Sequence, residues 1–399
     1  MSGIFQTKKL GELCNIVIGR TPSRSQPEYW GKGMKWLSIS DIQGKKINFT
    51  KEEITHHAFE ECGCRLLSKG TLVMSFKLSI GKLGFIMEPM CTNEAIAGLI
   101  IKEEGLICKE YLYYVLQAMD LVKGGDRAVK GVTLNKQKLN NLNIAYPSLE
   151  EQKKIVAVLD KAQALIEKRK AAIAKLDKLI QAIFIDTFGD PIKNPQNYEI
   201  VQLEELISFL TSGSRGWAKY FSKEGELFIT IKNVKNGQLQ LGDITYVNAP
   251  MGKEAERTKV QEGDLLISIT ADLGRTAVIS KEVASKGAYI NQHLSLIRLN
   301  QKCNPRYLSS YLESAGGKNQ FESLNQTGVK SGLNFAAIKS LKIVLPPLEK
   351  QNRYDLIFRE YLSEKEKMSM SLSMLEANFN SLLQRTFRGE VVINTEVTV

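Results

Sequence analysis

The sequence Tyr146-Pro147-Ser148-Leu149-Glu150-Glu151-Gln152 opens a long run of apolar residues at helical spacing, and Leu345-Pro346-Pro347-Leu348-Glu349-Lys350-Gln351 opens a second one. The two copies extend from Leu134-Asn135 to Thr187-Phe188 and from Leu333-Asn334 to Thr386-Phe387. They lie 199 positions apart throughout, and no gap is needed to align them. This period is too long for a solenoid repeat, so it indicates a duplicated domain.

Each repeated stretch is predicted to be a long helix. In the first, a seven-residue period runs from Ile155 to Ile183, with further apolar residues, such as Leu165 and Leu179, three or four positions after each member. This pattern is typical of a helix that packs along a partner helix. Two matching helices in one chain most simply pair with each other, antiparallel if a globular domain separates them. The predicted seam consists of Ile155, Leu159, Ala162, Ile166, Leu176, Ile183, Tyr354, Phe358, Tyr361, Leu375 and Leu382.

The blocks that precede the helices share a plan of short strands and glycine-containing turns. For example, the pairs Gly81-Lys82 and Gly274-Arg275 lie 193 positions apart, each in a turn after a predicted strand. We therefore expect an α+β protein with two tandem mixed α/β domains at 1–148 and 191–347. Two long helices at 149–190 and 348–399 separate them and pair as an antiparallel coiled coil.

The charge is concentrated in the two non-helical blocks. Of a net charge of +11 over 399 residues, 1–148 carry +6 and 191–347 carry +5, whereas the helical segments carry +1 and −1. Basic domains are typical of a protein that binds polyanions. The alternative is a basic surface that binds no particular ligand. No apolar run approaches the ~20 residues that cross a bilayer, and no signal-peptide pattern opens the chain, so we expect a cytoplasmic protein. Six scattered cysteines fit reduced, structural thiols.

At the two Pro-x-Leu-Glu-x-Gln helix starts the chain resembles the specificity subunit of type I restriction–modification enzymes. Tyr146 to Val156 is similar to the entry of that family's conserved region, and Pro346 to Gln351 lies where the second such region belongs. Turns such as Gly19-Arg20-Thr21-Pro22-Ser23 and Asn291-Gln292-His293-Leu294 resemble those of its target-recognition domains. The resemblance covers essentially the whole chain.

The resemblance implies a subunit that is not an enzyme by itself. Each target-recognition domain is expected to read one half of a bipartite sequence in double-stranded DNA, and the helices set the gap. The partners it implies are modification subunits, two of them expected, which methylate adenine N6, and restriction subunits that translocate and cut DNA. S-adenosylmethionine, ATP and Mg²⁺ are expected on those partners, with no cofactor bound by this chain.

Residues in or beside the glycine-rich loops are the candidates for DNA contact, because backbone approaches phosphate closely there and arginine can fork onto guanine. For each, a solvated charge or a packed aromatic is the alternative. In the first domain they are Arg20, Thr21, Ser23, Arg24, Lys77, Lys82, Arg127 and Lys130. In the second they are Ser214, Arg215, Trp217, Lys219, Tyr220, Lys232, Arg275, His293 and Lys330.

Catalytic and metal motifs are missing from the sequence. It contains no Gly-x4-Gly-Lys-Ser/Thr phosphate loop and no Asn/Asp-Pro-Pro-aromatic run. His56-His57 with Cys62 and Cys64 lacks the spacing and the second pair of a zinc site, which favours an ordinary loop. Two other hypotheses stay open: a coiled-coil scaffold that binds only proteins, and an enzyme whose site is unrecognised.

Overall fold

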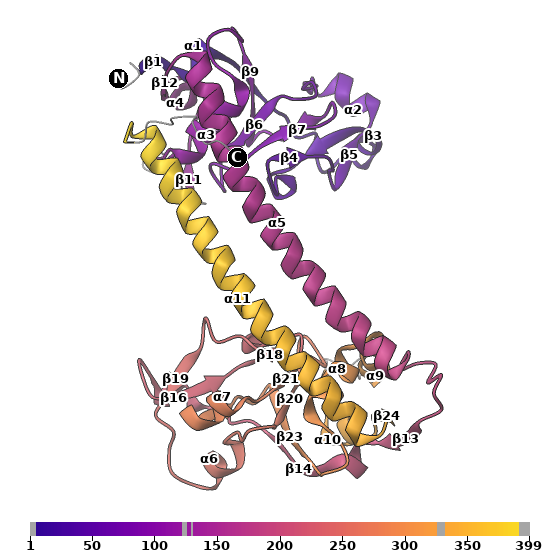
Figure 1. Cartoon of the computed structure of the whole chain (residues 1–399). Helices are drawn as coiled ribbons and strands as arrows, with labels where there is room; N and C mark the ends of the chain where they lie inside the picture. The colour runs from indigo at the N-terminus through magenta and orange to yellow at the C-terminus, as the bar shows by residue number, and fades with distance from the viewer. Residues whose placement is uncertain (1–4, 122–125, 129–130, 325–331, 391–399) are drawn as a thin grey trace. The chain divides into compact units, whose positions relative to one another are not determined.

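The computed structural model describes residues 5–121, 126–128, 131–324 and 332–390, with 126–128 and 131–133 described by their backbone alone. The chain divides into two compact units. The first comprises residues 1–170 and 371–399, and the second comprises 171–370. Each unit therefore holds one globular domain and a part of each long helix (Figure 1).

The first domain combines strands with short helices, as expected from the sequence. Its elements are β1 (Gln6–Lys9), α1 (Leu10–Leu13), β2 (Cys14–Ile18), β3 (Trp30–Leu37), β4 (Lys46–Ile47), β5 (Glu52–Ile54), α2 (His56–Glu61), β6 (Leu72–Ser75), β7 (Leu83–Ile86), β8 (Cys91–Thr92), β9 (Ile96–Ile101), α3 (Lys109–Ala118), β10 (Asp126–Ala128), β11 (Gly131–Thr133), α4 (Lys136–Asn140) and β12 (Asn143–Tyr146). The main sheet has the order β2-β9-β6-β7-β4, and a second sheet has the order β5-β3-β8. One side of the main sheet packs on α3, whose Tyr111 and Leu112 are fully buried.

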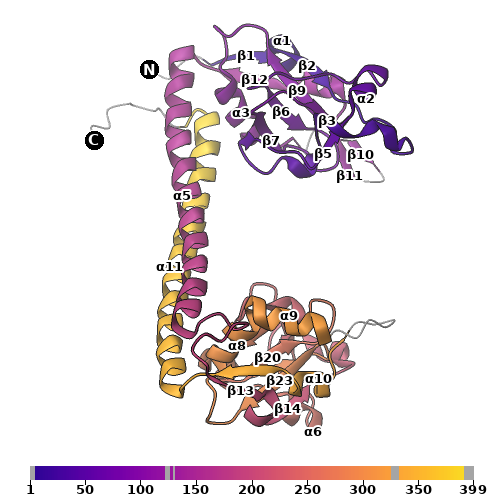
Figure 2. The ribbon, with the colours of Figure 1, turned by 90° about the vertical axis from the view of Figure 1, so that its right-hand side faces the viewer.

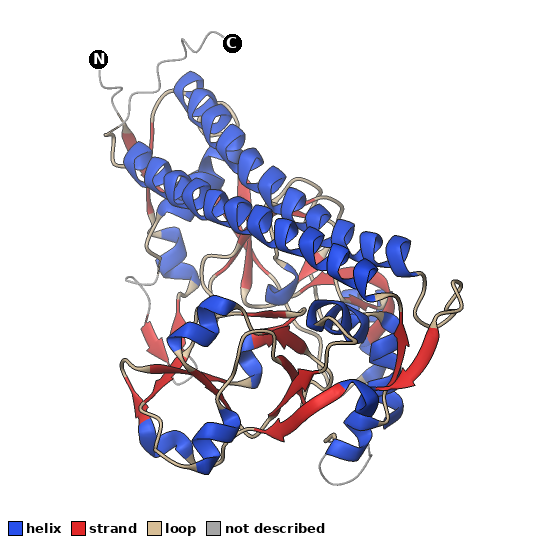
Figure 3. Cartoon of the chain, turned by 60° about the horizontal axis from the view of Figure 1, so that its bottom comes forward, coloured by secondary structure: helices blue, strands red, loops and turns tan. Residues whose placement is uncertain are grey.

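The second domain repeats this plan, with its strands and short helices drawn in red and blue in Figure 3. Its elements are β13 (Glu199–Gln202), β14 (Ile207–Ser212), β15 (Phe221–Ser222), β16 (Glu226–Ile229), β17 (Val234–Lys235), β18 (Gln238–Leu239), β19 (Thr245–Val247), α6 (Lys253–Thr258), β20 (Leu265–Ser268), β21 (Thr276–Val278), α7 (Lys281–Lys286), β22 (Ala288–Ile290), β23 (Leu294–Leu299), α8 (Pro305–Glu313), α9 (Ala315–Leu324), α10 (Phe335–Lys339) and β24 (Lys342–Leu345). The sheet orders are β14-β23-β20-β21 and β15-β19-β16-β22. In both domains the first strand pairs antiparallel with the last, β1 with β12 and β13 with β24.

The two repeated stretches form continuous 40-residue helices, α5 (Leu149–Phe188) and α11 (Leu348–Phe387). In each unit a segment of α5 lies beside a segment of α11 that runs in the opposite direction (Figure 2). Lys170 and Glu376 join the two helices within the first unit by an ion pair of 2.9 Å. The expected antiparallel pairing is therefore present.

The buried face of the helices is narrower than the heptad pattern predicts. The seam residues all lie in or against the two large core clusters, where Ile155, Leu159 and Ile166 join Tyr111 of the first domain. Leu165 and Leu179, which the pattern also includes, are each 53% exposed. Including them in the stripe was wrong, because in each unit a helix buries side chains only against the other helix and the domain of that unit, and these two side chains are left largely exposed.

The repeated helix-start sequence has the same structural role in both copies. Gln152 and Gln351 are fully buried. The Oε1 of Gln152 accepts the backbone N–H of Cys108 (2.9 Å), and the Oε1 of Gln351 accepts that of Asn304 (2.8 Å). Both N–H groups lie at the start of a domain helix, α3 or α8, so each glutamine fastens a long helix to its domain.

Candidate nucleic-acid interface

Four loops of the first domain meet at one edge of its sheets. We call residues 19–26, 38–41, 76–82 and 92–95 the first loop edge. Backbone hydrogen bonds tie the loops together: Arg20 N–H to Thr92 O (2.8 Å), Asn93 N–H to Leu37 O (3.1 Å) and Phe76 N–H to Ala95 O (2.9 Å). The candidate residues of domain 1 that the structure describes are thereby collected in one place.

Glycine is required where the first of these loops leaves its strand. A Cβ on Gly19 would lie 2.1 Å from the carbonyl oxygen of Thr92, which is a steric clash with backbone. Gly213 occupies the matching place in the second domain, where a Cβ would lie 2.1 Å from Asn291 O. In both domains the loop that begins at this glycine therefore passes close to the backbone near Thr92 or Asn291, which is a shared property of the duplicated scaffold.

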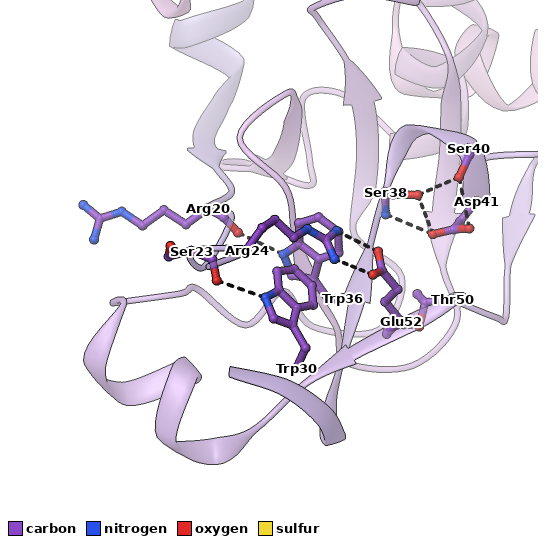
Figure 4. Close-up of polar contacts among 10 residues, drawn as sticks. All are labelled: Arg20, Ser23, Arg24, Trp30, Trp36, Ser38, Ser40, Asp41, Thr50 and Glu52. Atoms are coloured by element: carbon purple, nitrogen blue, oxygen red, sulfur yellow. Dashed lines mark hydrogen bonds and ion pairs between the residues drawn. The ribbon is translucent and has the colours of Figure 1, made fainter. Parts of the chain in front are cut away.

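Arg24 forms the most organised side-chain cluster of this edge (Figure 4). Its guanidinium carbon lies 3.6 Å from the ring centroid of Trp30 and 5.2 Å from that of Trp36. Its two terminal nitrogens donate to the carboxylate of Glu52 at 2.5 and 2.8 Å. The hydrogen bond between the two side chains raises the pKa of Arg24 and lowers that of Glu52. The fork of Arg24 is therefore occupied by a carboxylate, and the guanidinium plane is held rigid against tryptophan.

The other described candidates of domain 1 lie on the same loop edge. Arg20 is exposed, points away from the cluster in Figure 4, and donates to Cys62 O at 2.6 Å. Thr21 donates to Glu94. Lys82 reaches Ile39 O at 3.3 Å, which connects two of the four loops. Exposed Ser23 bonds Ser25 (2.8 Å), and half-buried Lys77 lies over the Phe76 ring.

The second domain repeats the three backbone hydrogen bonds that tie the first loop edge together. The second loop edge comprises residues 213–217, 230–233, 269–275 and 291–293. Its backbone bonds are Ser214 N–H to Ile290 O (2.9 Å), Asn291 N–H to Ile229 O (3.0 Å) and Ile269 N–H to His293 O (3.0 Å). The side chains differ from those of the first edge, so one backbone frame carries two surfaces.

Two candidates of domain 2 are corrected by their burial. Ser214 is 3% exposed and its hydroxyl bonds that of Thr258 at 3.0 Å. Trp217 is also 3% exposed, stacks on Phe228, and donates to Glu254 at 3.1 Å. Neither side chain is available for DNA, because both connect the loop to α6 and the core.

The remaining described candidates of domain 2 lie at or beside the second loop edge. Arg215, Lys219 and Lys232 are exposed, and within the described ranges no ion pair involves them. Tyr220 is half-buried against Trp217. Arg275 pairs with Asp272 at 2.6 Å, and the Nδ1 of His293 lies 2.8 Å from the hydroxyl of Thr270. Lys130 and Lys330 lie outside the described residues, as does the side chain of Arg127.

Three residues that contact or adjoin these edges were missed by the sequence prediction. Glu52 and Trp30 hold Arg24, and Arg257 of α6 donates to Thr211 and to Ser212 O. Tryptophan close to arginine in a basic block was a usable signal for Trp30. No such signal exists in the sequence for Glu52 or Arg257, since the partner of Glu52 is 28 residues away and those of Arg257 are 45 and 46 residues away.

Metal chemistry finds no support in the part of the chain that the structure describes. No group of three His, Cys, Asp or Glu side chains is placed there to hold an ion. His57 instead forms a 3.0 Å pair with Glu61. Among the described residues, no helix is long and apolar enough to cross a membrane.

The chain contains two copies of one domain. Each copy has a polar loop edge and packs on an antiparallel helix pair. These features define a class of duplicated protein with two polar surfaces. The family model of the type I restriction modification DNA specificity domain matches the chain twice, over residues 4–176 and 195–366. The chain belongs to this family.

Individual relatives carry corresponding names. The MjaIX specificity subunit of Methanocaldococcus jannaschii is 28% identical over 261 residues, which span 58% of this chain and 59% of that protein. The EcoBI specificity subunit of Escherichia coli is 19% identical over 337 residues, 76% of this chain and 70% of its own length. The match with the M. jannaschii protein thus leaves about two fifths of that protein unaligned.

Solved structures share the fold. A chain from a structure of a type I restriction–modification system has a TM-score of 0.59 at 18% identity, covering 98% of this chain and 99% of its own. The S subunit of such a system from M. genitalium has a TM-score of 0.53 at 14% identity, covering 96% of both chains. At these identities the similarity establishes the architecture alone.

Proposed function

We propose that this chain is the non-catalytic DNA-specificity subunit of a type I restriction–modification complex. Each loop edge reads one half of a bipartite DNA sequence, and the paired helices set the gap between the halves. The observation that carries the proposal is the duplicated loop edge, whose backbone bonds are shared while its side chains differ. Such a frame suits a reader of two unlike half-sites, because backbone placement positions a protein on DNA and side chains specify bases.

The chemistry of modification and cutting then belongs to other chains. The proposed partners are two modification subunits that methylate adenine N6 with S-adenosylmethionine, and restriction subunits that use ATP and Mg²⁺. The long helices are the proposed docking surface for the modification subunits. The proposed location of the complex is the cytoplasm, where it would act on double-stranded DNA.

Mapping methylated adenines in a host that expresses the complete system tests the proposal. We expect a single bipartite motif with a constant gap, which disappears when the gene for this chain is deleted. Methylation that persists without this chain, or a motif without a gap, would contradict the proposal.

Exchange of domain 1 tests the division of labour between the loop edges. Replacing residues 1–145 with the corresponding domain of a relative is expected to change one half of the methylated motif only. The reciprocal exchange of 191–347 serves as the control and should change the other half. A change in both halves after either exchange would rule out two independent readers.

A protein-only scaffold is the second candidate, and the exposed Leu165 and Leu179 on the long helices fit it as well as they fit docking of modification subunits. Salt dependence separates the two functions. Duplex affinity of the assembled methyltransferase should fall steeply between 50 and 200 mM salt, by about 10³-fold or more if at least six phosphates are contacted. An assembled complex without salt-sensitive duplex binding would favour the scaffold.

A further inference from the structure

The turn between β6 and β7 carries an unusual residue at its tip. Leu78 has a φ of +63° and is 60% exposed. Its counterpart in the second domain, Ala271, has a φ of +54° and is also exposed. These are two of the five described residues other than glycine with positive φ, and they occupy the same place in the duplicated fold.

In each of the two turns, one buried serine forms two hydrogen bonds with the backbone that follows the tip. The hydroxyl of Ser75 donates to Ser79 O and accepts the N–H of Lys82 at 3.0 Å. Ser268 makes the same two bonds, to Asp272 O and from Arg275 N–H at 2.8 Å. Since Ser75 and Ser268 are both fully buried, the left-handed tip is a built feature of the scaffold.

The left-handed conformation costs free energy for any residue with a Cβ, and glycine adopts it without that cost. Neither copy uses glycine at the tip. The first copy instead places a large apolar side chain there and exposes it to solvent. Strain of this kind concentrates where a protein contacts a ligand, which suggests that the Leu78 side chain is retained for a contact.

The surroundings of Leu78 indicate DNA as that ligand. The turn belongs to the first loop edge, because Phe76 bonds Ala95 and Lys82 bonds Ile39 O at 3.3 Å. Lys77 and Lys82 flank the tip with two positive charges. Cations that hold phosphates beside an apolar side chain are the combination with which proteins contact base steps or thymine methyl groups.

We propose that Leu78 makes an apolar contact with the bases of the half-site read by the first domain. This inference rests on the proposed function and assigns one residue of the reading surface. Ala271 presents only a methyl group on the same turn, so the second domain lacks this contact. The two half-sites are then read by different means at equivalent positions of the fold.

Substitutions in the full chain, assembled with its modification subunits, test the inference. Leu78→Ala is expected to lower affinity for a duplex with the cognate first half-site about tenfold, whereas Leu78→Met should retain it. Leu78→Gly should lose affinity equally while the midpoint of thermal unfolding stays the same or rises, since it relieves the left-handed strain. Asn236→Gly is the matched control: Asn236 is exposed, has a φ of +51° in the turn between β17 and β18, and lies outside both loop edges, so affinity and first-half discrimination should stay unchanged.

Modified DNA identifies the kind of contact. If Leu78 contacts a thymine methyl, uracil in place of one thymine of the first half-site should weaken wild-type binding and not that of Leu78→Ala. If Leu78 is a wedge, 2-aminopurine at one step should brighten on wild-type binding and not with Leu78→Ala. Either result supports the inference.

Other results would overturn it. The inference is wrong if Leu78→Ala retains wild-type affinity and discrimination. It is also wrong if the loss of affinity in Leu78→Ala is explained by weaker subunit assembly. In both cases the wild-type complex remains sequence-specific, so the proposed function stands. A wild-type complex that shows no sequence-specific duplex binding would defeat both.

Discussion

At the scale of single residues, Arg24 shows how a surface charge is organised before any ligand arrives. The two terminal nitrogens of its guanidinium bond Glu52, and the plane of the guanidinium lies on the ring of Trp30. The positive charge of Arg24 is therefore held in a fixed position. DNA binding must either use the pair as it stands or exchange Glu52 for a base. Lysine cannot replace arginine in this arrangement, because it has neither the planar fork nor the stacking face.

If a base takes the place of Glu52 on the Arg24 fork, Arg24→Lys should reduce discrimination within the first half-site by about 1–3 kcal/mol, the value of one bidentate contact. If the Arg24–Glu52 pair stays intact on DNA, this discrimination should be unchanged. Discrimination within the second half-site should stay the same and serves as the internal control. Competition binding with single-base variants of each half-site measures both. An equal loss in the two halves would mean that Arg24 acts through the fold.

The Arg24–Glu52 pair also predicts a direction of pH dependence. Its hydrogen bond lowers the pKa of Glu52 below the ordinary 4.5. The pair's contribution to folding stability is therefore fully present above pH 4.5 and is lost as the pH falls through the lowered pKa. Glu52→Gln should remove this acid-side loss, which unfolding midpoints measured between pH 3 and pH 6 would show as a flatter profile; an unchanged profile would argue against the pair.

Gln152 is the buried polar residue that helps attach α5 to domain 1. Gln152→Ala would leave the N–H of Cys108 and the carbonyl oxygens of Leu106 and Pro147 without their partner. We expect the free energy of unfolding to fall by about 1–3 kcal/mol, the cost of an unsatisfied buried group. Denaturant unfolding measures it, with Gln163→Ala as control, since Gln163 bonds Glu167 on the surface of the same helix. Equal effects of the two substitutions would contradict the attachment role.

At the scale of elements, the long helices combine a buried seam with exposed apolar residues. Leu159 is fully buried against the first domain and α11, while Leu165, less than two turns away, is 53% exposed. The same amino acid thus has two environments on one helix. An exposed leucine contributes little to the stability of the chain alone, so any role of Leu165 lies in binding.

This difference gives a matched pair of substitutions. Leu159→Ala should lower the free energy of unfolding by about 2–5 kcal/mol, because it opens a cavity in the core. Leu165→Ala should change it by about 0.5 kcal/mol or less. Denaturant midpoints of the two variants test the assignment, and a large loss for Leu165→Ala would show that its side chain is buried in solution.

At the scale of the whole molecule, the helices are the proposed determinant of the gap between half-sites. Removing seven residues from the centre of each helix shortens both by about 10.5 Å while the heptad register is kept. If the helices set the gap, the methylated motif should retain both half-sites and lose about three base pairs between them, at 3.4 Å per base pair. Removing seven residues from one helix only is the control and should mispair the seam. A shortened protein with the original gap would exclude the spacer role.

The sequence by itself determined the duplication, the two long helices and the concentration of positive charge in the domains. These are patterns of residue spacing and composition. Within a continuous helix or strand, the spacing of residues along the chain directly sets their positions in the structure. The repeated Leu-Asn is an example: Asn135 and Asn334 both cap a short helix through their side-chain oxygens. The stretches at 19–24 and 213–217 were also predicted as loops, whereas their place in one loop edge of each domain came from the structure.

Only the tertiary structure decided which side chains of those loops are available. Ser214 and Trp217 are buried, Arg24 is paired with Glu52, and Leu165 faces solvent. Leu78 stands out only once its φ and exposure are known. Burial and pairing depend on which distant segments meet, and no local spacing encodes that meeting. The physical reason is that a side chain's environment is set by the fold around it, while its sequence neighbours set only the element it stands on.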